Sequence, residues 1–469
     1  MKAFLSFYHI KLPVYLVYML QQVEYNPHKF LKWITTFPNL KRVRHRKSVV
    51  WTFKARILFA IIVFFWIFYA LLTVFYLLIA PVTGLMSLFL LPFLVILVTY
   101  IIVLFGWLYV EEPRRRKKIK ESRKIFDKHP GVKIAILGSY GKTSMKELLK
   151  TVLSETRTVA ATPGNQNVPI SHATWAKKLS GTEDVLLIEY GEYAKGSIKE
   201  LAKLSKPTHA VITGLAPNHL DQYKDLDAVA KDLLSITSFV ENKKVFVSDT
   251  KPLNTYDIHE TTKYSSSKVL SWDISDIKVT IDGTEFVMKH KKKHIHVKSG
   301  LLGRHQVAPL AFVAALADDL GLSIPKIESG LAKTVPYEHR MQPRLQHGAW
   351  IIDDTYNGSL EGIRAGLELL KELPAKRKVY VTPGLVDQGI ETKRVHREMG
   401  ELIAAANPDR VVLMKNSATP QIIEGLEKGE YRGDLHIEAD PLAYYTNLEQ
   451  VIAAGDLVML QNDWTDNYF

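Results

Sequence analysis

Two long apolar runs stand out in the pattern of hydrophobic and polar positions. Residues 57–80 and residues 85–110 carry no charged side chain, and the turn signal Pro81-Val-Thr-Gly84 separates them. At about 1.5 Å of rise per residue, each run is long enough for a helix that crosses a hydrocarbon core of about 30 Å. The pattern therefore predicts a transmembrane hairpin, which with its flanks occupies residues 51–125.

Two basic clusters flank the open end of this predicted hairpin, and its turn carries none. They consist of Lys41, Arg42, Arg44, Arg46, Lys47, Lys54 and Arg56, and of Arg114, Arg115, Arg116, Lys117, Lys118, Lys120, Arg123 and Lys124. Positive residues stay on the cytoplasmic side, so we expect a multi-pass protein of the cell membrane whose later domains face the cytoplasm. At this position the clusters are expected to contact anionic membrane lipids rather than nucleic acid.

The first 50 residues are less regular. Residues 4–20 are mostly apolar, but His9, Lys11 and Pro13 interrupt the run. No small-residue cleavage site follows, which disfavours a cleaved signal peptide. We expect residues 1–50 to be embedded in the membrane or to lie at its surface. A simple tether with no catalytic part is the alternative for the whole membrane region.

From residue 126 onward, short apolar runs alternate with helical patterns. This alternation predicts an α/β protein with a mostly parallel, doubly wound sheet. We place a central domain at residues 126–335 and a C-terminal domain at residues 336–469. The predicted strands lie at 132–137, 184–190, 209–213, 244–248, 350–354, 378–382, 410–414 and 457–461, with hairpin-like strands around Asp282-Gly283 and a helix at 309–320.

Composition adds two limits. The chain has 469 residues, enough for two or three domains, and a net charge of +13 that comes mainly from the two basic clusters. It has no cysteine, which excludes disulfides and thiolate chemistry.

A glycine-containing turn joins the first predicted strand of the central domain to a helix. Gly138 and Gly141 allow a tight turn and a close approach to phosphate, and the new helix presents its free N–H groups there. Lys142 adds a positive charge, and the Thr143 hydroxyl suits Mg²⁺. Ala135 replaces the first glycine of the full P-loop pattern. The loop predicts an ATP and Mg²⁺ site made by Gly138, Ser139, Gly141, Lys142, Thr143 and Ser144; an ordinary strand–turn–helix is the alternative.

Several motifs then follow in a fixed order. They are Gly138-Ser-Tyr-Gly-Lys-Thr-Ser-Met-Lys-Glu147, Thr162-Pro-Gly-Asn-Gln-Asn167, Ile188-Glu-Tyr-Gly191, Asn218-His-Leu220, Ala230-Lys231, Gly303-Arg-His305 and Ile352-Asp-Asp-Thr-Tyr-Asn357. Together they resemble the Mur ligases over about 330 residues, and most of all the members that add D-alanyl-D-alanine to a UDP-muramyl tripeptide. The resemblance implies a P-loop central domain and a Rossmann-like C-terminal ligase domain.

The resemblance also implies a reaction and its catalytic residues. The family forms an amide bond with ATP: a substrate carboxylate becomes an acyl phosphate, an amine attacks it, and ADP and phosphate are released. Lys142 would bind the β- and γ-phosphates, and Thr143, Glu189, His219 and Lys231 would serve the metal ions. Lys231 would act as a carbamate. Each of three of these residues, considered alone, also has a simpler interpretation. Glu189 is then a surface acid at a strand end, His219 is a loop histidine, and Lys231 is a solvated helix lysine.

Further residues take binding roles by the same resemblance. Asn165 and Asn167 would contact phosphate, metal or the substrate carboxylate, although Asn-rich loops are often only turns. The residues expected to bind the nucleotide from later motifs are His305, Arg340, Asp354 and Asn357.

The sequence departs from the family pattern at several places. Gln306 stands at one position where the family has asparagine. Gly214 stands at a second position where the family usually has asparagine. Residues 382–389 form a different loop where the family selects the incoming amine. A membrane hairpin occupies the place of the N-terminal domain that binds the UDP-sugar, so we expect a carboxylate substrate that is lipid-linked or recognised by another subunit.

The leading prediction is a membrane-anchored, ATP-dependent amide ligase of peptidoglycan precursor synthesis. Its partners would be ATP, a UDP-linked or lipid-linked envelope precursor with a carboxylate, an amino acid or dipeptide, and membrane lipids. A ligase like the poly-γ-glutamate synthases is one alternative. A nucleotide-binding envelope scaffold without turnover is another, but the joint presence of Lys142, Thr143, Glu189, His219 and Lys231 argues against it.

Overall fold

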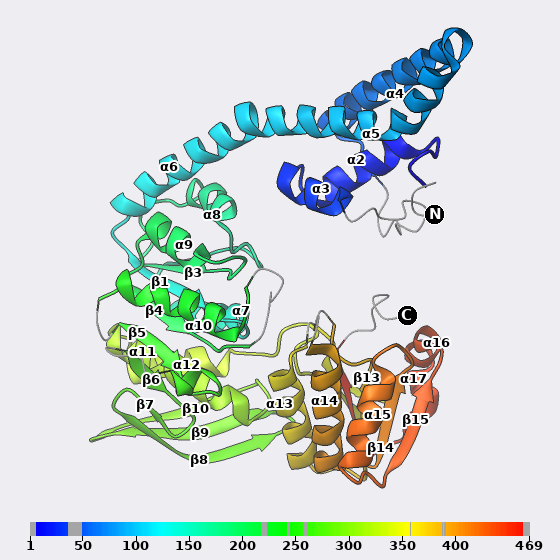
Figure 1. The fold of residues 1–469 in the computed structure, drawn as a ribbon. Helices are drawn as coiled ribbons and strands as arrows, with labels where there is room; N and C mark the ends of the chain where they lie inside the picture. The colour runs from blue at the N-terminus through cyan, green and yellow to red at the C-terminus, as the bar shows by residue number, and fades with distance from the viewer. Residues whose placement is uncertain are drawn as a thin grey trace. The chain divides into compact units, whose positions relative to one another are not determined.

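The computed structural model describes residues 6–35, 49–216, 223–241, 244–256, 261–356, 358–386, 388 and 391–462. The chain divides into two compact units, Met1–Lys120 and Glu121–Phe469. Figure 1 shows the order of the elements along the chain.

The first unit is helical. Its two long helices pair as a hairpin, in which Thr73 Oγ1 and Ser87 Oγ lie 2.8 Å apart. Gly84 makes the close approach possible, because a Cβ atom there would lie 2.5 Å from the backbone nitrogen of Leu77. The helices of this unit are α2 (Leu12–Gln22), α3 (Pro27–Ile34), α4 (Phe53–Ile79) and α5 (Pro81–Gly106), followed by the π-helical turn η2 (Trp107–Glu111) and by α6 (Glu112–Lys128), which continues past the boundary of the unit.

The hairpin turn differs from the sequence expectation. Pro81 to Gly84 form the first turn of α5 rather than a separate turn, and the reversal is at Ala80. Proline is well suited to the first position of a helix, because its missing N–H has no helical partner there. By length and composition, α4 and the continuous helix that begins at Pro81 are both able to cross a membrane.

A ten-stranded mixed sheet forms the first half of the second unit. Its order is β10-β9-β8-β7-β6-β5-β4-β1-β3-β2, parallel from β2 to β6 and antiparallel from β6 to β10. The expected hairpin strands therefore extend the parallel sheet. The strands are β1 (Val132–Leu137), β2 (Val159–Ala161), β3 (Val185–Glu189), β4 (His209–Ile212), β5 (Val245–Ser248), β6 (Thr262–Tyr264), β7 (Lys268–Val269), β8 (Trp272–Thr280), β9 (Gly283–His290) and β10 (Lys293–Ser299).

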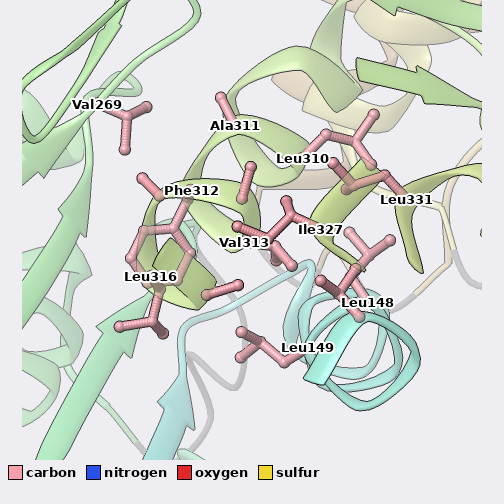
Figure 2. Close-up of a cluster of buried hydrophobic side chains, with 14 of the residues drawn as sticks. Leu148, Leu149, Val269, Leu310, Ala311, Phe312, Val313, Leu316, Ile327 and Leu331 are labelled. Atoms are coloured by element: carbon pink, nitrogen blue, oxygen red, sulfur yellow. The ribbon is translucent and has the colours of Figure 1, made fainter. Parts of the chain in front are cut away.

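Helices cover this sheet and share its main core. Leu148 and Leu149 of one helix meet Val313 and Ile327 of two others in this core (Figure 2). The contact is close because Gly330 lies against Val152, where a Cβ atom would come within 2.8 Å of Val152 Cα. The helices are α7 (Lys142–Leu153), α8 (Pro169–Ala176), α9 (Ser197–Ser205), α10 (Leu226–Leu234), α11 (Val307–Asp319) and α12 (Ile324–Ala332), with short 3₁₀ turns η3 (Ser235–Ser238), η4 (Leu253–Thr255) and η5 (Arg304–Gln306).

A second, six-stranded sheet follows, in the order β11-β12-β16-β13-β14-β15. All neighbours are parallel except β11 and β12. Tyr380 packs with the helices α13 to α15, which lie side by side (Figure 1), whereas Val379 and Val381 pack with Tyr444 and Leu448. The elements are β11 (Gln342–Gln346), β12 (Ala349–Asp354), α13 (Leu360–Glu372), β13 (Arg377–Thr382), α14 (Thr392–Ala406), β14 (Arg410–Met414), α15 (Thr419–Lys428), β15 (Asp434–Glu438), α16 (Pro441–Thr446), α17 (Leu448–Val451) and β16 (Asp456–Gln461).

The expected alternation of strands and helices is confirmed, including each of the eight strand positions named from the sequence. The predicted domain boundaries at residues 50, 125 and 335 stay predictions.

Candidate active site

The loop between β1 and α7 is fixed against the end of β4. Ser139 N donates to Gly214 O over 2.9 Å, and Thr213 Oγ1 donates to the carbonyls of Leu137 and Tyr140. Gly138 has a φ of +139°, and a Cβ atom there would lie 2.4 Å from Thr213 Oγ1. Only glycine therefore fits at position 138. Because this residue has no Cβ atom, a bound group can approach the backbone of the loop closely.

The first turn of α7 is open to an anion. Gly141 begins the helix in a left-handed conformation, and no side chain caps the free N–H groups that follow. Uncapped N–H groups at the positive end of a helix dipole bind phosphate well. The loop thus has the geometry expected for phosphate binding.

Glu189 lies at the end of a strand that pairs with β1. It is the last residue of β3 and is 1% exposed. Its Oε2 accepts hydrogen bonds from Thr143 Oγ1 at 3.2 Å and from Lys146 Nζ at 3.0 Å, and its Oε1 accepts one from Asn167 Nδ2 at 3.3 Å. The structure therefore brings together three of the predicted residues, Thr143, Asn167 and Glu189.

Lys146 is a residue that the sequence reasoning missed. It is fully buried, and its Nζ donates to Glu189 and to the carbonyl of Gly164. A signal was available, because positions 142 and 146 share one face of a helix. A lysine inside the apolar face of α7 is a further sign of a polar role.

Lys142 is held by a second missed residue, Glu192. Lys142 Nζ donates to Glu192 Oε2 at 2.9 Å and Oε1 at 3.1 Å, and also to the carbonyl of Gly138. Lys142 is mostly buried, and the Glu192 side chain is 2% exposed. No pattern in the sequence distinguishes Glu192 from an ordinary loop acid.

His172 supports Glu189 from behind. Its Nε2 lies 2.9 Å from the carbonyl oxygen of Glu189, and burial lowers the pKa of His172 to about 4. The ring is therefore neutral at physiological pH, and it donates a hydrogen bond through Nε2, since a carbonyl can only accept. This bond fixes the backbone at the end of β3.

The donor set of this site suits Mg²⁺. Glu189 offers a carboxylate, Thr143 a hydroxyl and Asn167 an amide oxygen, which are the hard ligands that Mg²⁺ prefers. Within the ranges that the structure describes, no three His, Cys, Asp or Glu side chains gather as a metal cluster. Mg²⁺ commonly takes few protein ligands and fills its other positions with phosphate oxygens and water.

Two of the other predicted residues of the central domain lie at the surface. Lys231 is exposed on α10, and Asn165 is exposed on the loop after β2. Beside Lys231, Asp232 is buried and accepts hydrogen bonds from Ser197 Oγ at 3.1 Å and Tyr223 Oη at 2.8 Å. His219 lies outside the described residues.

The predicted nucleotide-binding residues of the later motifs form separate groups. Asp354 ends β12 and accepts hydrogen bonds from Met341 N at 3.2 Å and Gln461 Nε2 at 2.8 Å. Burial raises the pKa of Asp354 to about 6, and the charge of Arg340 acts against that rise. The Arg340 guanidinium lies 4.3 Å from the ring centre of Tyr356.

His305 and Asn357 complete the predicted set. His305 is exposed in η5, where its Nε2 accepts a hydrogen bond of 2.9 Å from Gln306 Nε2. Gln306, which replaces the family's asparagine, therefore still provides an amide beside this histidine. Asn357 lies outside the described residues.

Comparisons with known proteins agree with this fold. Residues 136–317 match the model of the Mur ligase middle domain, and residues 339–461 match that of the Mur ligase glutamate ligase domain. The UDP-N-acetylmuramoyl-tripeptide--D-alanyl-D-alanine ligase of Escherichia coli is 29% identical over 340 residues, which are 71% of this chain and 73% of that protein. The protein of the same name from Bacillus subtilis is 25% identical over 339 residues, 70% of this chain and 72% of its own length.

Solved structures show the same fold. A crystal structure of MurF from Acinetobacter baumannii has a TM-score of 0.65 at 20% identity and covers 74% of this chain and 77% of its own. MurF from Thermotoga maritima in complex with ADP has a TM-score of 0.62 at 23% identity, over 74% of this chain and 80% of its own. The two family models together cover most of both sheets of the second unit, so this chain belongs to the Mur ligase family and is an ATP-dependent ligase that requires Mg²⁺.

Proposed function

We propose that this chain is a MurF-type ligase of peptidoglycan precursor synthesis. It would join the amine of D-alanyl-D-alanine to the terminal carboxylate of a muramyl-tripeptide precursor and convert ATP to ADP and phosphate. The observation that carries the proposal is the hydrogen-bonded cluster that half-buried Thr143 and Asn167 form with buried Glu189 at the end of a β-strand, beside Lys142. The names of the relatives support the choice of substrates.

In this function the residues divide the work. Lys142 and the uncapped start of α7 neutralise the phosphate charge that grows during transfer to the substrate carboxylate. Thr143 and Glu189 hold Mg²⁺, which supplies further positive charge at the phosphates. Asn167, hydrogen-bonded to Glu189, orients that carboxylate. We assign metal support to His219 and Lys231.

The second sheet would hold the nucleotide from the other side. We assign this role to Arg340, Asp354 and Asn357, with His305 and Gln306 near the adenine. Substrate positioning of this kind converts a reaction between separate molecules into one within a single complex.

We further propose that α4 and α5 anchor the enzyme in the cell membrane. Large apolar side chains point outward from these helices although water would disfavour them there. They include Phe64, Phe68, Leu71, Phe75, Leu78, Leu85, Phe89 and Leu97. The exposed basic residues of α6 follow the hairpin directly, which favours an anionic, cytoplasmic surface beside them.

Membrane anchoring is tested on the full chain. A membrane-spanning hairpin keeps the protein in the pellet after an alkaline carbonate wash and after high salt, and only detergent releases it. Release by salt alone would replace the hairpin with an electrostatic surface contact.

Product mass spectrometry tests the activity. The detergent-purified chain is given ATP, Mg²⁺, D-alanyl-D-alanine and a UDP-muramyl tripeptide, with glutamate as a parallel amine and a lipid-linked tripeptide as a parallel acceptor. A D-alanyl-D-alanine adduct on the UDP-linked acceptor supports the proposal, and Lys142→Ala should remove it while the fold is kept. Products only from the lipid-linked acceptor would make this a membrane-substrate ligase.

A glutamate product would favour the poly-γ-glutamate type of ligase. ATP turnover that is absent in every combination would favour a scaffold.

A further inference from the structure

Glu192 forms a contact with Lys142 to which the proposed function assigns no role. Its carboxylate holds Lys142 with both oxygens, at 2.9 and 3.1 Å from Nζ. Both partners are shielded from water, with 2% of the Glu192 side chain and 14% of the Lys142 side chain exposed. Charges attract one another more strongly in such surroundings than at an open surface.

Every N–H donor of the Lys142 ammonium already has an acceptor. A lysine ammonium has three N–H donors. In this structure they face Gly138 O, Glu192 Oε1 and Glu192 Oε2. No donor remains for a phosphate oxygen until at least the contact with Glu192 has opened.

We propose that Glu192 is a positioning residue that competes with the nucleotide phosphates for Lys142. The inference rests on the proposed function, in which Lys142 binds those phosphates. When the nucleotide binds, phosphate oxygens replace the Glu192 carboxylate on Nζ. Glu192 holds the lysine in place before binding, and it lowers the affinity for nucleotides by the free energy of the contact that has to open.

The segment around Glu192 connects this exchange to the metal-binding residues. Gly191 N donates to Asn167 O over 2.9 Å, and a Cβ atom at Gly191 would lie 2.8 Å from Asn167 Oδ1. Asn167 in turn donates to Glu189. Glu192 is therefore adjacent in sequence to a backbone that contacts Asn167, the partner of the Glu189 carboxylate.

Nucleotide affinity of a neutral variant tests the competition. Glu192→Gln removes the charge and keeps the shape, so the dissociation constant for ADP, measured by calorimetry on the full chain in detergent with Mg²⁺, should fall by about threefold or more. Adenosine, which has no phosphate, should bind both proteins equally. In steady state the KM for ATP should fall, while kcat changes little.

Two further variants serve as a control and as a substitute for Glu192→Gln. Glu200→Gln removes a charge from nearby α9, where Glu200 accepts a hydrogen bond from Tyr193, and should leave the ADP affinity unchanged. Glu192→Ala should act in the same direction as Glu192→Gln and replaces it if the glutamine variant does not fold.

The possible outcomes distinguish the competition of Glu192 for Lys142 from the assignment of Lys142 to phosphate binding. If the wild type binds ADP and Glu192→Gln binds it equally or more weakly, Glu192 does not compete, and the inference is overturned while the proposed function stands. If neither protein binds ADP, the assignment of Lys142 to phosphate is wrong, and the competition is overturned with it.

Discussion

The ring of Tyr140 lies directly against Gly214. A Cβ atom at position 214 would come within 2.2 Å of Tyr140 Cζ, so no larger residue fits beside the ring. The Tyr140 hydroxyl donates to Thr250 Oγ1 at 3.3 Å, and burial raises its pKa. This pair explains why glycine stands at a position where the sequence resemblance leads one to expect asparagine.

The first prediction follows from this pair. Gly214→Asn should lower the free energy of unfolding by about 1–3 kcal/mol, because the new side chain overlaps the Tyr140 ring. Tyr140→Ser in the same chain should recover much of the loss. Thermal unfolding of the two single variants and the double variant measures the coupling.

Gly362 provides the matched control, since a Cβ atom there meets only Ser359 Oγ at 3.5 Å. Gly362→Ala lies in α13 and should be neutral or slightly stabilising. Equal losses from Gly214→Asn with and without Tyr140 would mean that the two positions do not interact.

The second prediction concerns the buried pair of Lys146 and Glu189. Lys146→Met should cost about 3–5 kcal/mol of stability, because it leaves a buried carboxylate without its cation. The double variant Lys146→Met with Glu189→Leu should be more stable than Lys146→Met alone, although it should have no ligase activity. Unfolding midpoints and phosphate release measure the two effects separately.

Lys150→Met changes an exposed lysine on the same helix and should alter stability by no more than about 0.5 kcal/mol. A Lys146→Met variant as stable as this control would show that the pair contributes nothing to the fold.

The third prediction concerns Lys231. Its exposed position on α10 lets dissolved carbon dioxide reach the amine, and a carbamate would turn a cation into an oxygen ligand for Mg²⁺. Lys231→Ala should abolish most turnover, and a short-chain carboxylate in the buffer should restore part of it. Intact-mass analysis under gentle conditions should find one added CO₂ on the wild type.

Lys224→Ala, at another exposed lysine nearby, serves as the control and should remain active. A fully active Lys231→Ala, with no added mass on the wild type, would remove the carbamate from the mechanism.

The fourth prediction concerns the pH dependence of His396. This buried ring donates from Nδ1 to Thr392 O at 2.6 Å and accepts at Nε2 from Leu385 N at 3.0 Å. Burial lowers its pKa, so the folded protein resists protonation while the unfolded chain takes up a proton near pH 6.5. Stability is therefore complete above about pH 6.5 and falls as the pH decreases below it.

His396→Gln removes this titration and keeps an acceptor for Leu385 N. Between pH 7.5 and 5 the wild type should lose more unfolding free energy than the variant, by at most about 1.4 kcal/mol per pH unit. The other buried histidines contribute equally to both curves, so the difference isolates His396. If the unfolding free energies of the wild type and the variant change with pH in the same way, His396 does not cause the pH dependence.

Local patterns in the sequence were enough for much of the fold. The strand ends, the loop at Gly138 and the long helices follow from periodicity, glycine placement and length. The continuation of the parallel sheet into β7 to β10 did not follow, because strand order depends on contacts between distant segments. The boundary at Pro81 was misplaced, because proline ends one helix pattern and begins the next with the same local signal.

The candidate site was predictable only in part. Thr143 and Glu189 were found because a strand end and a helix start identify such positions. Lys146 and Glu192 were missed, because their meaning lies in the partners that folding brings to them. His219, Lys231 and Asn357 keep their assigned roles as predictions.

The register between β1 and β3 places Ile136 opposite Glu189. In a strand, a shift by one residue moves every side chain to the opposite face. The apolar residues of β3 that fill the core thus also decide which way Glu189 points. Substitutions deep in this sheet can therefore inactivate the enzyme without touching any residue that binds a ligand, and screens for loss of function will score such core positions as though they were catalytic.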